Sequence, residues 1–345
     1  MSTRDEWLLA VRLRQLGDVL ASLEVLRALK AHRPERRIAF VVNGPYAPLV
    51  EHEPYIDRVL VPPEGGLNAW LHFLREVRSL HPSAAIDLHG SARSALITRV
   101  SGAPLRAGFD VRGRRRAYNV VEPRGEFNAD GRRIPHNPIT WGARLARHAG
   151  CGITNTRPPA IKAGEIARDS VRTRLIEAGV GLAAVESRNL VALNPGRAVP
   201  TKYWDPSRFI DLGRSLRHEG RDVIVFWGPG EESNAEMIAR EAGALCAPSL
   251  SLVEMCAALR FCAALVTIDS GLKHLAVCAR TPTVTVFGST DPREWHMGDE
   301  HDIALWKGLS CSPCRRLDCP MGVPCMGIDT AAVLDALKHA LGAAS

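Results

Sequence analysis

Short apolar runs alternate with amphipathic segments in the first half of the chain. The runs predict buried strands, and apolar residues spaced three and four positions apart in the segments predict helices. The expected strands cover residues 7–13, 38–42, 59–61 and 84–88. The expected helices cover residues 19–31, 67–80, 91–100 and 137–149. This alternation favours a parallel sheet with helices on both faces.

The same pattern returns after residues 154–164, a stretch rich in proline and polar residues that is the best linker candidate. The expected strands here cover residues 190–194, 222–227, 264–268 and 283–287. The expected helices cover residues 206–218 and 251–260, a segment from residue 272 onward, and residues 330–341. We therefore predict an α/β protein with two Rossmann-like domains, residues 1–160 and 161–328, and a ligand cleft between them. In such sheets, ligands bind beyond the carboxyl ends of the strands.

One segment, between residues 110 and 135, breaks the pattern. It is poor in apolar residues and rich in arginine, with Arg112, Arg114, Arg115, Arg116, Arg124, Arg132 and Arg133. We expect a long, mobile, basic loop. Such a loop is either a solvated charged surface or a functional element.

Polar turns follow several expected strands, and the turn in VTIDSGLKHLA, residues 266–276, is the most informative. Asp269, Ser270 and Gly271 would join a buried strand to the next helix. Such a turn places a carboxylate, a hydroxyl and free backbone N–H groups at a helix N-terminus, which attracts phosphate groups. The alternative is an ordinary helix cap. His274, one turn into the helix, either packs in the core or contacts a bound diphosphate.

Three further turns carry candidate groups. Asp18 follows the first expected strand, and its carboxylate either caps the next helix or faces the cleft. Thr201 and Lys202 follow the first strand of the second domain, where a lysine either neutralises a phosphate or lies in solvent. The turn GPGEE offers Glu231 or Glu232 to ribose hydroxyls, unless this acidic pair only starts a helix.

Composition narrows the function. The chain has 345 residues, of which 46% are hydrophobic and 23% charged, as in a globular protein of two domains. Its formal net charge of +7 favours an anionic ligand, and no basic helix interleaved with aromatic residues supports nucleic-acid binding. No signal peptide or apolar run of membrane length is visible, which predicts a cytoplasmic protein. The dinucleotide fingerprint and the P-loop motif are missing from the sequence, which disfavours hydride transfer and P-loop hydrolysis. No D-x-D pair occurs either, so this common metal-binding signature is absent from the sequence.

Four of the nine cysteines lie close together near the C-terminus. Cys311, Cys314, Cys319 and Cys325 follow the spacing C-x2-C-x4-C-x5-C. Four thiolates in one short segment suit a tetrahedral zinc or iron site. Two disulfides or four free thiols are the alternatives, and a reducing cytosol disfavours the disulfides. The remaining cysteines are expected to be small buried hydrophobic residues.

Several short motifs, taken in order, resemble one known family. They are RQLGDVLASLEVLRALK, the series NPG, TKYW and RF, then GPGEE, IDSGLKHLA, TPTVTVFGSTDP and the cysteine segment CSPC…CP…C. Together they resemble glycosyltransferase family 9, the ADP-heptose:lipopolysaccharide heptosyltransferases. The resemblance implies a GT-B fold in which a C-terminal helix, residues 329–345, packs back on the first domain. It also implies that catalysis needs no metal or cofactor, so zinc or iron at the cysteines would be structural.

The resemblance implies roles for residues that match the family's motifs. Asp18 matches the catalytic base, which deprotonates the acceptor hydroxyl for attack on the donor's anomeric carbon with inversion. Lys202, together with Thr201, matches the group that stabilises the departing ADP phosphates. Glu231 matches, less closely, a residue that recognises ribose.

The motif IDSGLKHLA carries most of the implied donor site. Asp269 matches a carboxylate that holds sugar hydroxyls, whereas Ser270 and Gly271 match the cradle for the diphosphate. His274 lies in the same motif. Lys273 departs from the family pattern, in which a small residue or proline is expected. It would either add positive charge near the phosphates or lie in solvent.

The implied reaction moves heptose from ADP-heptose to an inner-core lipopolysaccharide acceptor. Arg114, Arg115 and Arg116 would bind the carboxylates and phosphates of this anionic acceptor, and a peripheral contact with the inner membrane is a further expectation. Another nucleotide sugar or a protein acceptor is the alternative within the fold. A non-catalytic sugar-nucleotide-binding protein is the alternative from another class. A glycosidase, which needs two carboxylates flanking one bond, ranks last.

Overall fold

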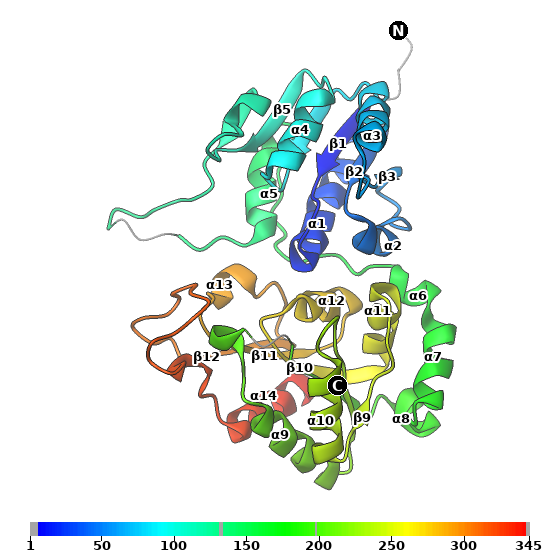
Figure 1. Cartoon of the computed structure of the whole chain (residues 1–345), viewed down its shortest axis with the longest axis vertical. Helices are drawn as coiled ribbons and strands as arrows, with labels where there is room; N and C mark the ends of the chain where they lie inside the picture. The colour runs from blue at the N-terminus through cyan, green and yellow to red at the C-terminus, as the bar shows by residue number, and fades with distance from the viewer. Residues whose placement is uncertain (1–5, 131–133, 197–198, 343–345) are drawn as a thin grey trace. The chain divides into compact units, whose positions relative to one another are not determined.

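The computed structural model describes residues 6–130, 134–196 and 199–342. The chain divides into two compact units, Met1–Pro159 and Ala160–Ser345, and each contains its own six-stranded sheet (Figure 1). The strand pairs of both sheets are parallel. The prediction of an α/β fold with two Rossmann-like parallel sheets is therefore confirmed.

The sheet of the first unit has the strand order β3-β2-β1-β4-β5-β6. Its strands are β1 (Trp7–Val11), β2 (Arg37–Val41), β3 (Arg58–Leu60), β4 (Ala84–Asp87), β5 (Leu105–Phe109) and β6 (Val120–Glu122). Its helices are α1 (Leu16–His32), α2 (Ala47–Val50), α3 (Leu67–Ser79), α4 (Ala92–Val100) and α5 (Pro138–Arg147), with 3-10 turns η1 (Gly44–Tyr46) and η2 (Arg115–Ala117). In the pairing of β1 with β4, Val11 lies beside Asp87, so the two central strands end at the same edge. Side chains that follow these strands are thereby brought together.

The basic segment between residues 110 and 135 is more ordered than we predict from its composition. It contains η2 and β6, and β6 forms the edge of the sheet beside β5. Tyr118 anchors it, because its buried ring packs on Gly108, where an added β-carbon would lie 2.5 Å from the ring. The expectation of one long mobile loop is therefore wrong for the first half of the segment. Arg132 and Arg133 lie outside the described residues.

The sheet of the second unit has the strand order β12-β11-β10-β7-β8-β9. Its strands are β7 (Leu190–Asn194), β8 (Asp222–Val225), β9 (Leu245–Cys246), β10 (Cys262–Ile268), β11 (Thr283–Phe287) and β12 (Asp302–Trp306). Its helices are α6 (Ala163–Ile166), α7 (Arg168–Glu177), α8 (Leu182–Ser187), α9 (Pro206–His218), α10 (Glu232–Ala242), α11 (Leu252–Phe261), α12 (Gly271–Ala279), α13 (Pro292–Trp295) and α14 (Thr330–Gly342), with 3-10 turns η3 (Pro200–Lys202) and η4 (Pro324–Met326). β10 is buried along its whole length and mostly apolar, as expected for a central parallel strand.

The core of the second unit includes its C-terminal helix. Trp204 is fully buried, its ring meets Phe209 edge-on with centroids 4.7 Å apart, and its indole N–H donates to the Ile328 carbonyl at 2.9 Å. Val333 and Leu337 of α14 belong to the same core, and α14 packs on β10, β11, β12 and α9. The apolar face of α14 is thus buried within the second unit. The expected packing of this helix on the first unit stays a prediction.

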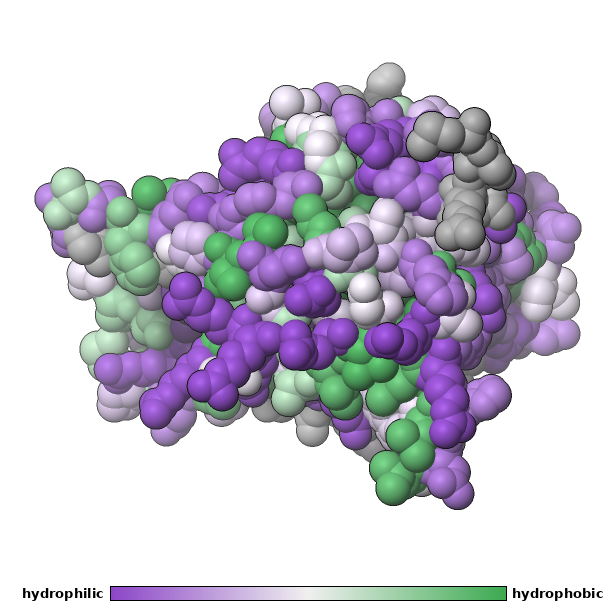
Figure 2. All heavy atoms as spheres, turned by 90° about the horizontal axis from the view of Figure 1, so that it is seen from above, coloured by the Kyte–Doolittle hydropathy of each residue, from purple (hydrophilic) through white to green (hydrophobic). Residues whose placement is uncertain are grey.

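The surface carries both polar and apolar groups. Polar side chains cover most of the face shown in Figure 2, with smaller apolar patches between them. Leu67 and Leu71 on α3, and Phe127, are among the large apolar side chains that are exposed. Within the described ranges, no helix combines the length and the apolar character needed to cross a membrane. The expected peripheral membrane contact stays a prediction.

Candidate active site

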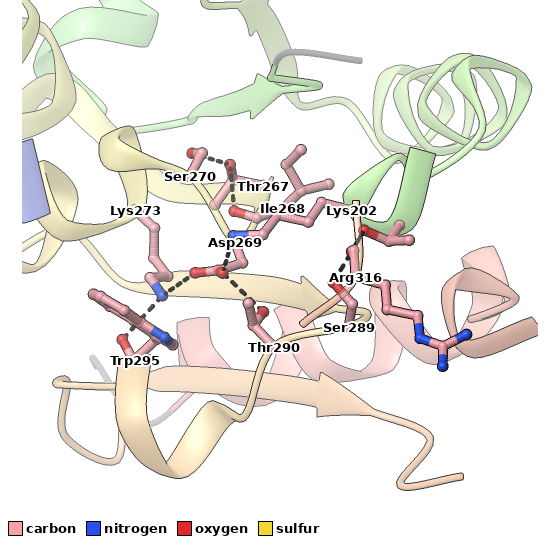
Figure 3. Close-up of polar contacts among 11 residues, drawn as sticks. Lys202, Thr267, Ile268, Asp269, Ser270, Lys273, Ser289, Thr290, Trp295 and Arg316 are labelled. Atoms are coloured by element: carbon pink, nitrogen blue, oxygen red, sulfur yellow. Dashed lines mark hydrogen bonds and ion pairs between the residues drawn. The ribbon is translucent and has the colours of Figure 1, made fainter. Parts of the chain in front are cut away.

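A buried carboxylate with two lysine partners lies at the carboxyl end of β10 (Figure 3). The side chain of Asp269, which follows this strand directly, is 6% exposed. Its Oδ2 accepts hydrogen bonds from Lys202 Nζ at 2.7 Å and from the Thr290 hydroxyl at 2.8 Å. Its Oδ1 accepts from Lys273 Nζ at 2.9 Å. Protein groups therefore occupy both carboxylate oxygens, and we call these four residues the Asp269 cluster.

The charges of the Asp269 cluster shift its pKa values. Burial alone would raise the pKa of Asp269, but the ammonium groups of Lys273 and Lys202 outweigh burial and hold this pKa well below its usual range. Burial lowers the pKa of Lys273, and the charge of Asp269 opposes that effect. With both lysines protonated, one carboxylate is shared by two cations, so the cluster has an excess of positive charge.

The helix that follows Asp269 adds backbone donors to this end of the sheet. α12 begins at Gly271 with Ser270 as its N-cap residue, and the Ser270 side chain makes no capping hydrogen bond. The Ser270 hydroxyl instead lies 3.3 Å from both Thr267 Oγ1 and Asn194 Oδ1. Because the first N–H groups of an α-helix lack partners within the helix, this N-terminus suits a phosphate. The structure thus places Ser270 and Gly271 beside the cationic cluster.

His274 lies in the buried face of α12. Its ring meets the Trp295 ring edge-on, with centroids 6.1 Å apart. Burial, assisted by the charge of Lys273, lowers the pKa of His274 well below its usual range, which keeps the ring neutral at pH 7. Among the described residues, its Nδ1 has no hydrogen-bond partner. The packing role is visible, and the diphosphate contact of His274 stays a prediction.

Thr201 and Lys202 are adjacent in η3 but face different surroundings. Lys202 reaches Asp269 and keeps 30% of its side chain exposed. Thr201 is buried, and its hydroxyl donates to the Arg316 carbonyl at 2.6 Å and accepts from Ser289 Oγ at 3.0 Å. Thr201 therefore ties the cysteine segment to the turn after β11. Its predicted contact with the ADP phosphates stays a prediction.

The four clustered cysteines line one cavity of about 260 Å³. All nine cysteines are free thiols. Burial, together with the other three thiols, raises the pKa of Cys325. Within the described parts of the chain, no three His, Cys, Asp or Glu side chains are grouped so as to hold a metal ion. The arrangement therefore shows no ready metal site, and zinc or iron at Cys311, Cys314, Cys319 and Cys325 stays a prediction.

Glu231 closes the turn GPGEE. It is the N-cap residue of α10, and its Oε2 accepts a hydrogen bond from the Gly228 N–H at 2.9 Å. The carboxylate thus shapes the turn that follows β8. Its predicted contact with ribose stays a prediction.

In the first unit, Asp18 lies in the first turn of α1, just after β1. Its Oδ1 forms an ion pair with the guanidinium of Arg12, and the two side chains are 16% and 12% exposed, respectively. Arg12 also donates to the Leu88 carbonyl beyond β4. This charge-assisted contact fixes the orientation of the Asp18 carboxylate, and the N-terminus of α1 stabilises its negative charge. The position fits the predicted base, a role that stays a prediction.

A second carboxylate, Asp87, ends β4 and is fully buried. It accepts hydrogen bonds from the Tyr118 hydroxyl at 2.6 Å and from the Gly90 N–H at 2.8 Å. Burial raises the pKa of Asp87 even though these hydrogen bonds oppose the shift. The Tyr118 contact joins the basic segment to the central strands.

We expect Tyr118→Phe to lower the free energy of unfolding by about 1–3 kcal/mol, because it removes a donor from a buried carboxylate. Thr98→Val is the matched control, since it also removes a buried hydroxyl, but one that donates to the helix carbonyl of Ser94 at 2.9 Å. Urea denaturation measures both. Equal losses in the two variants would contradict a special role for the contact of Tyr118 with Asp87.

Positive charge gathers at the carboxyl end of the first sheet. Burial and the charges of Arg12, Arg14 and Arg124 lower the pKa of His89 to about 4. Arg114 is also close enough to act on the Tyr118 hydroxyl. The charges of Arg12, Arg14 and Arg124 therefore reach His89, which follows the end of β4.

The three arginines predicted to bind the acceptor are not equivalent. Arg114 is half-buried, and its Nη1 donates to the Arg112 carbonyl at 2.8 Å. Arg115 and Arg116 are exposed, and Arg115 lies 3.9 Å from Asp110. Within this triplet, Arg114 is the residue whose charge reaches the Tyr118 hydroxyl. Their binding to an acceptor stays a prediction.

The two parallel sheets and the cationic helix terminus after β10 define a GT-B type of α/β protein, as predicted. The model of the family described as glycosyltransferase family 9 (heptosyltransferase) matches residues 70–323, and the chain belongs to this family. Lipopolysaccharide heptosyltransferase 1 of Pseudomonas aeruginosa is 26% identical to it over 332 residues, which cover 90% of this chain and 86% of the relative.

Solved structures agree with this fold. The glycosyl transferase family 9 protein from Veillonella parvula has a TM-score of 0.85 at 20% identity and covers 99% of both chains. The ADP-heptose LPS heptosyltransferase II of E. coli has a TM-score of 0.78 at 20% identity, with 98% of this chain and 99% of that chain covered. The predicted family and the GT-B fold are thus confirmed.

Three residues of the site were not singled out from the sequence. Asn194 and Thr290 join the ends of neighbouring strands through side-chain hydrogen bonds to Thr267 and Asp269. Arg12 holds Asp18. Arg12 did have a usable signal, because it is a charged residue at the end of the apolar run WLLAVRL. Asn194 ends β7 and Thr290 follows β11, and the partners of both are distant in sequence.

Proposed function

We propose that the protein is an inverting glycosyltransferase that moves heptose from ADP-heptose to an inner-core lipopolysaccharide acceptor. The observation that carries the proposal is the Asp269 cluster beside the N-terminus of α12, since excess positive charge and free N–H groups suit a nucleoside diphosphate. The family description supports the sugar class. The names of the relatives, which include lipopolysaccharide heptosyltransferases, support the acceptor class.

In this proposal the two units contribute different steps. Asp18, in the first unit, takes the proton of the acceptor hydroxyl while the hydroxyl oxygen attacks the anomeric carbon. A new glycosidic bond forms, the bond to the diphosphate breaks on the opposite face, and the configuration inverts. Lys202 and the N-terminus of α12 stabilise the charge of the departing ADP. We propose metal-independent catalysis because these groups supply the positive charge that the leaving group needs.

A panel of ADP-, UDP- and GDP-sugars tests the donor class. A ligand that binds the native state raises the melting temperature, so we expect ADP and ADP-heptose to give the largest shifts. A larger shift with a UDP- or GDP-sugar would replace the proposed donor with another nucleotide sugar. Binding of ADP-heptose without turnover to free ADP, in the presence of a core acceptor, would favour a non-catalytic binding protein. Mass spectrometry of the product then identifies the acceptor, including a protein acceptor.

The proposed location is the cytoplasm, with a peripheral contact at the inner membrane. The acceptor class supports this location, because a growing lipopolysaccharide core presents anionic groups to a basic protein surface. The arginines of the first unit are the candidate contact.

Replacing Arg114, Arg115 and Arg116 together with Ala is expected to raise the acceptor KM by about tenfold, because charge-assisted contacts to carboxylates or phosphates are lost. The donor KM should stay unchanged. Arg114→Ala alone should account for most of the effect, since Arg114 is half-buried and less screened than the exposed Arg115 and Arg116. Steady-state kinetics with varied acceptor measures both variants.

The matched control replaces exposed arginines of the second unit, Arg172, Arg214 and Arg240, with Ala, which removes the same charge elsewhere. The acceptor assignment would be contradicted if the acceptor KM is unchanged in the Arg114, Arg115 and Arg116 variant. It would also be contradicted if both triple variants raise this KM equally.

A further inference from the structure

Lys273 is a fully buried lysine inside the proposed donor site. Its side chain is 2% exposed, and its Nζ donates to Asp269 Oδ1 and to the Trp295 carbonyl, each at 2.9 Å. The same ammonium lies 4.5 Å from the centroid of the Phe287 ring. Figure 3 shows Lys273 reaching Asp269 from the side opposite Lys202. Lys273 therefore does not lie in solvent, which was one of the two outcomes considered for it.

A buried ammonium is costly unless a charge balances it. Asp269 supplies that charge, while the Trp295 carbonyl and the Phe287 ring supply further favourable contacts. Asp269 precedes the N-cap residue of α12 and Lys273 lies in the first turn of this helix, so the start of the helix brings the ammonium onto the carboxylate four positions earlier. The lysine is thus held by dedicated partners.

The consequence concerns Lys202. If Asp269 had Lys202 as its only cationic partner, the two charges would cancel and little field would reach a bound anion. With Lys273 already balancing the carboxylate, the charge of the partly exposed Lys202 remains available. The hydrogen bond to Asp269 thus positions Lys202, while the positive charge of Lys202 is not neutralised by Asp269.

We propose that Lys273 is a positioning residue that neutralises Asp269 from the buried side, so that Lys202 is held in place and still presents a net positive charge to a diphosphate. This inference rests on the proposed function, because it assigns the charge of the same donor site. It gives Asp269 the task of holding Lys202, while its predicted contact with sugar hydroxyls stays a prediction.

Other charged groups around the cluster do not replace Lys273. His274 is buried and His296 is half-buried, and desolvation lowers the pKa values of both, so they are neutral at pH 7. Asp302 is a distant partner of Lys273 and adds negative charge only. Within the described residues around Asp269, Lys273 is therefore the group that balances the carboxylate in addition to Lys202.

The test uses two variants and one matched control, with binding measured by calorimetry. In Lys273→Met, the negative charge of Asp269 cancels the positive charge of Lys202, so ADP affinity should fall by at least about tenfold. AMP affinity should fall less, because AMP carries less negative charge than ADP. In the double variant Lys273→Met, Asp269→Asn, an amide oxygen still accepts from Lys202 and the excess charge returns, so ADP affinity should recover to within about threefold of wild type. Lys338→Met removes an exposed lysine that pairs with Glu219 and should change nothing.

The recovery distinguishes charge from structure. A lysine that only supports packing predicts that the double variant binds ADP no better than Lys273→Met, and that result would overturn the inference. Unchanged ADP affinity in folded Lys273→Met would overturn it as well. If Lys273→Met does not fold, the test uses the double variant alone, because its two neutral side chains leave no unpaired buried charge. The ADP affinity of the double variant is then compared with that of the wild type. Failure of the wild-type protein to bind any nucleoside diphosphate would instead overturn the proposed function.

Discussion

Asp18→Asn is expected to abolish sugar transfer while ADP binding persists. The amide cannot take a proton from the acceptor hydroxyl, so kcat should fall by about 10²–10⁴-fold, the usual contribution of a general base. The substitution is nearly isosteric, and its amide oxygen can still accept from Arg12, which holds the carboxylate in the native protein. The fold of the first unit should therefore be preserved. Turnover of ADP-heptose and ADP affinity are the two measurements.

The control for this variant is Glu64→Gln, which makes the same chemical change at an exposed position of the same unit. It should leave both quantities unchanged. Full residual turnover in Asp18→Asn would refute the assignment of the base. Loss of ADP binding along with turnover would show that Asp18 acts on the donor.

Lys202→Met is expected to lower kcat/KM for the donor by about 10²–10³-fold, the loss typical of removing one preorganised group from a developing negative charge. The melting temperature should change little, because Lys273 still balances the buried carboxylate of Asp269. Lys202 itself is partly exposed, so its removal leaves no large cavity. Steady-state kinetics and thermal denaturation test the two parts of this expectation.

The comparison of Lys202→Met with Lys273→Met separates two lysines that share one carboxylate. The first variant should lose catalysis and keep stability, whereas the second loses a buried charge partner and should also lose stability. Lys338→Met controls for the removal of a lysine as such. Unchanged donor turnover in Lys202→Met would place the leaving-group cation elsewhere.

The sequence pattern predicted most of the central strands and their following helices, because strands and helices of a parallel α/β protein are encoded by local periodicity. The expected strands at residues 84–88 and 283–287 match β4 and β11 to within a residue. The pattern failed for β5 and β6. β6 is an edge strand of only three residues, and it is held by the contact of Tyr118 with Gly108 and Asp87 rather than by its own composition.

Part of the candidate site could likewise be predicted from local sequence, and part could not. The turn at Asp269, Ser270 and Gly271 could be read from the sequence, because an apolar run followed by polar residues and an amphipathic helix is a local signal. The partners of Asp269 could not be read in this way. Lys202 is 67 positions away in the chain, and Thr290 comes from a different strand end. Parallel strands bring such residues together only when the sheet forms.

The sequence by itself determined the two α/β units, the places where strands end in polar turns, and the family, because periodicity and the order of short motifs are properties of the linear chain. Only the tertiary structure decided what each polar side chain does. It placed Arg12 on Asp18 and buried Lys273 against Asp269, which leaves Lys202 as the partly exposed cation. The physical reason is that burial and charge pairing depend on neighbours across the sheet, whereas a turn depends on residues next to it.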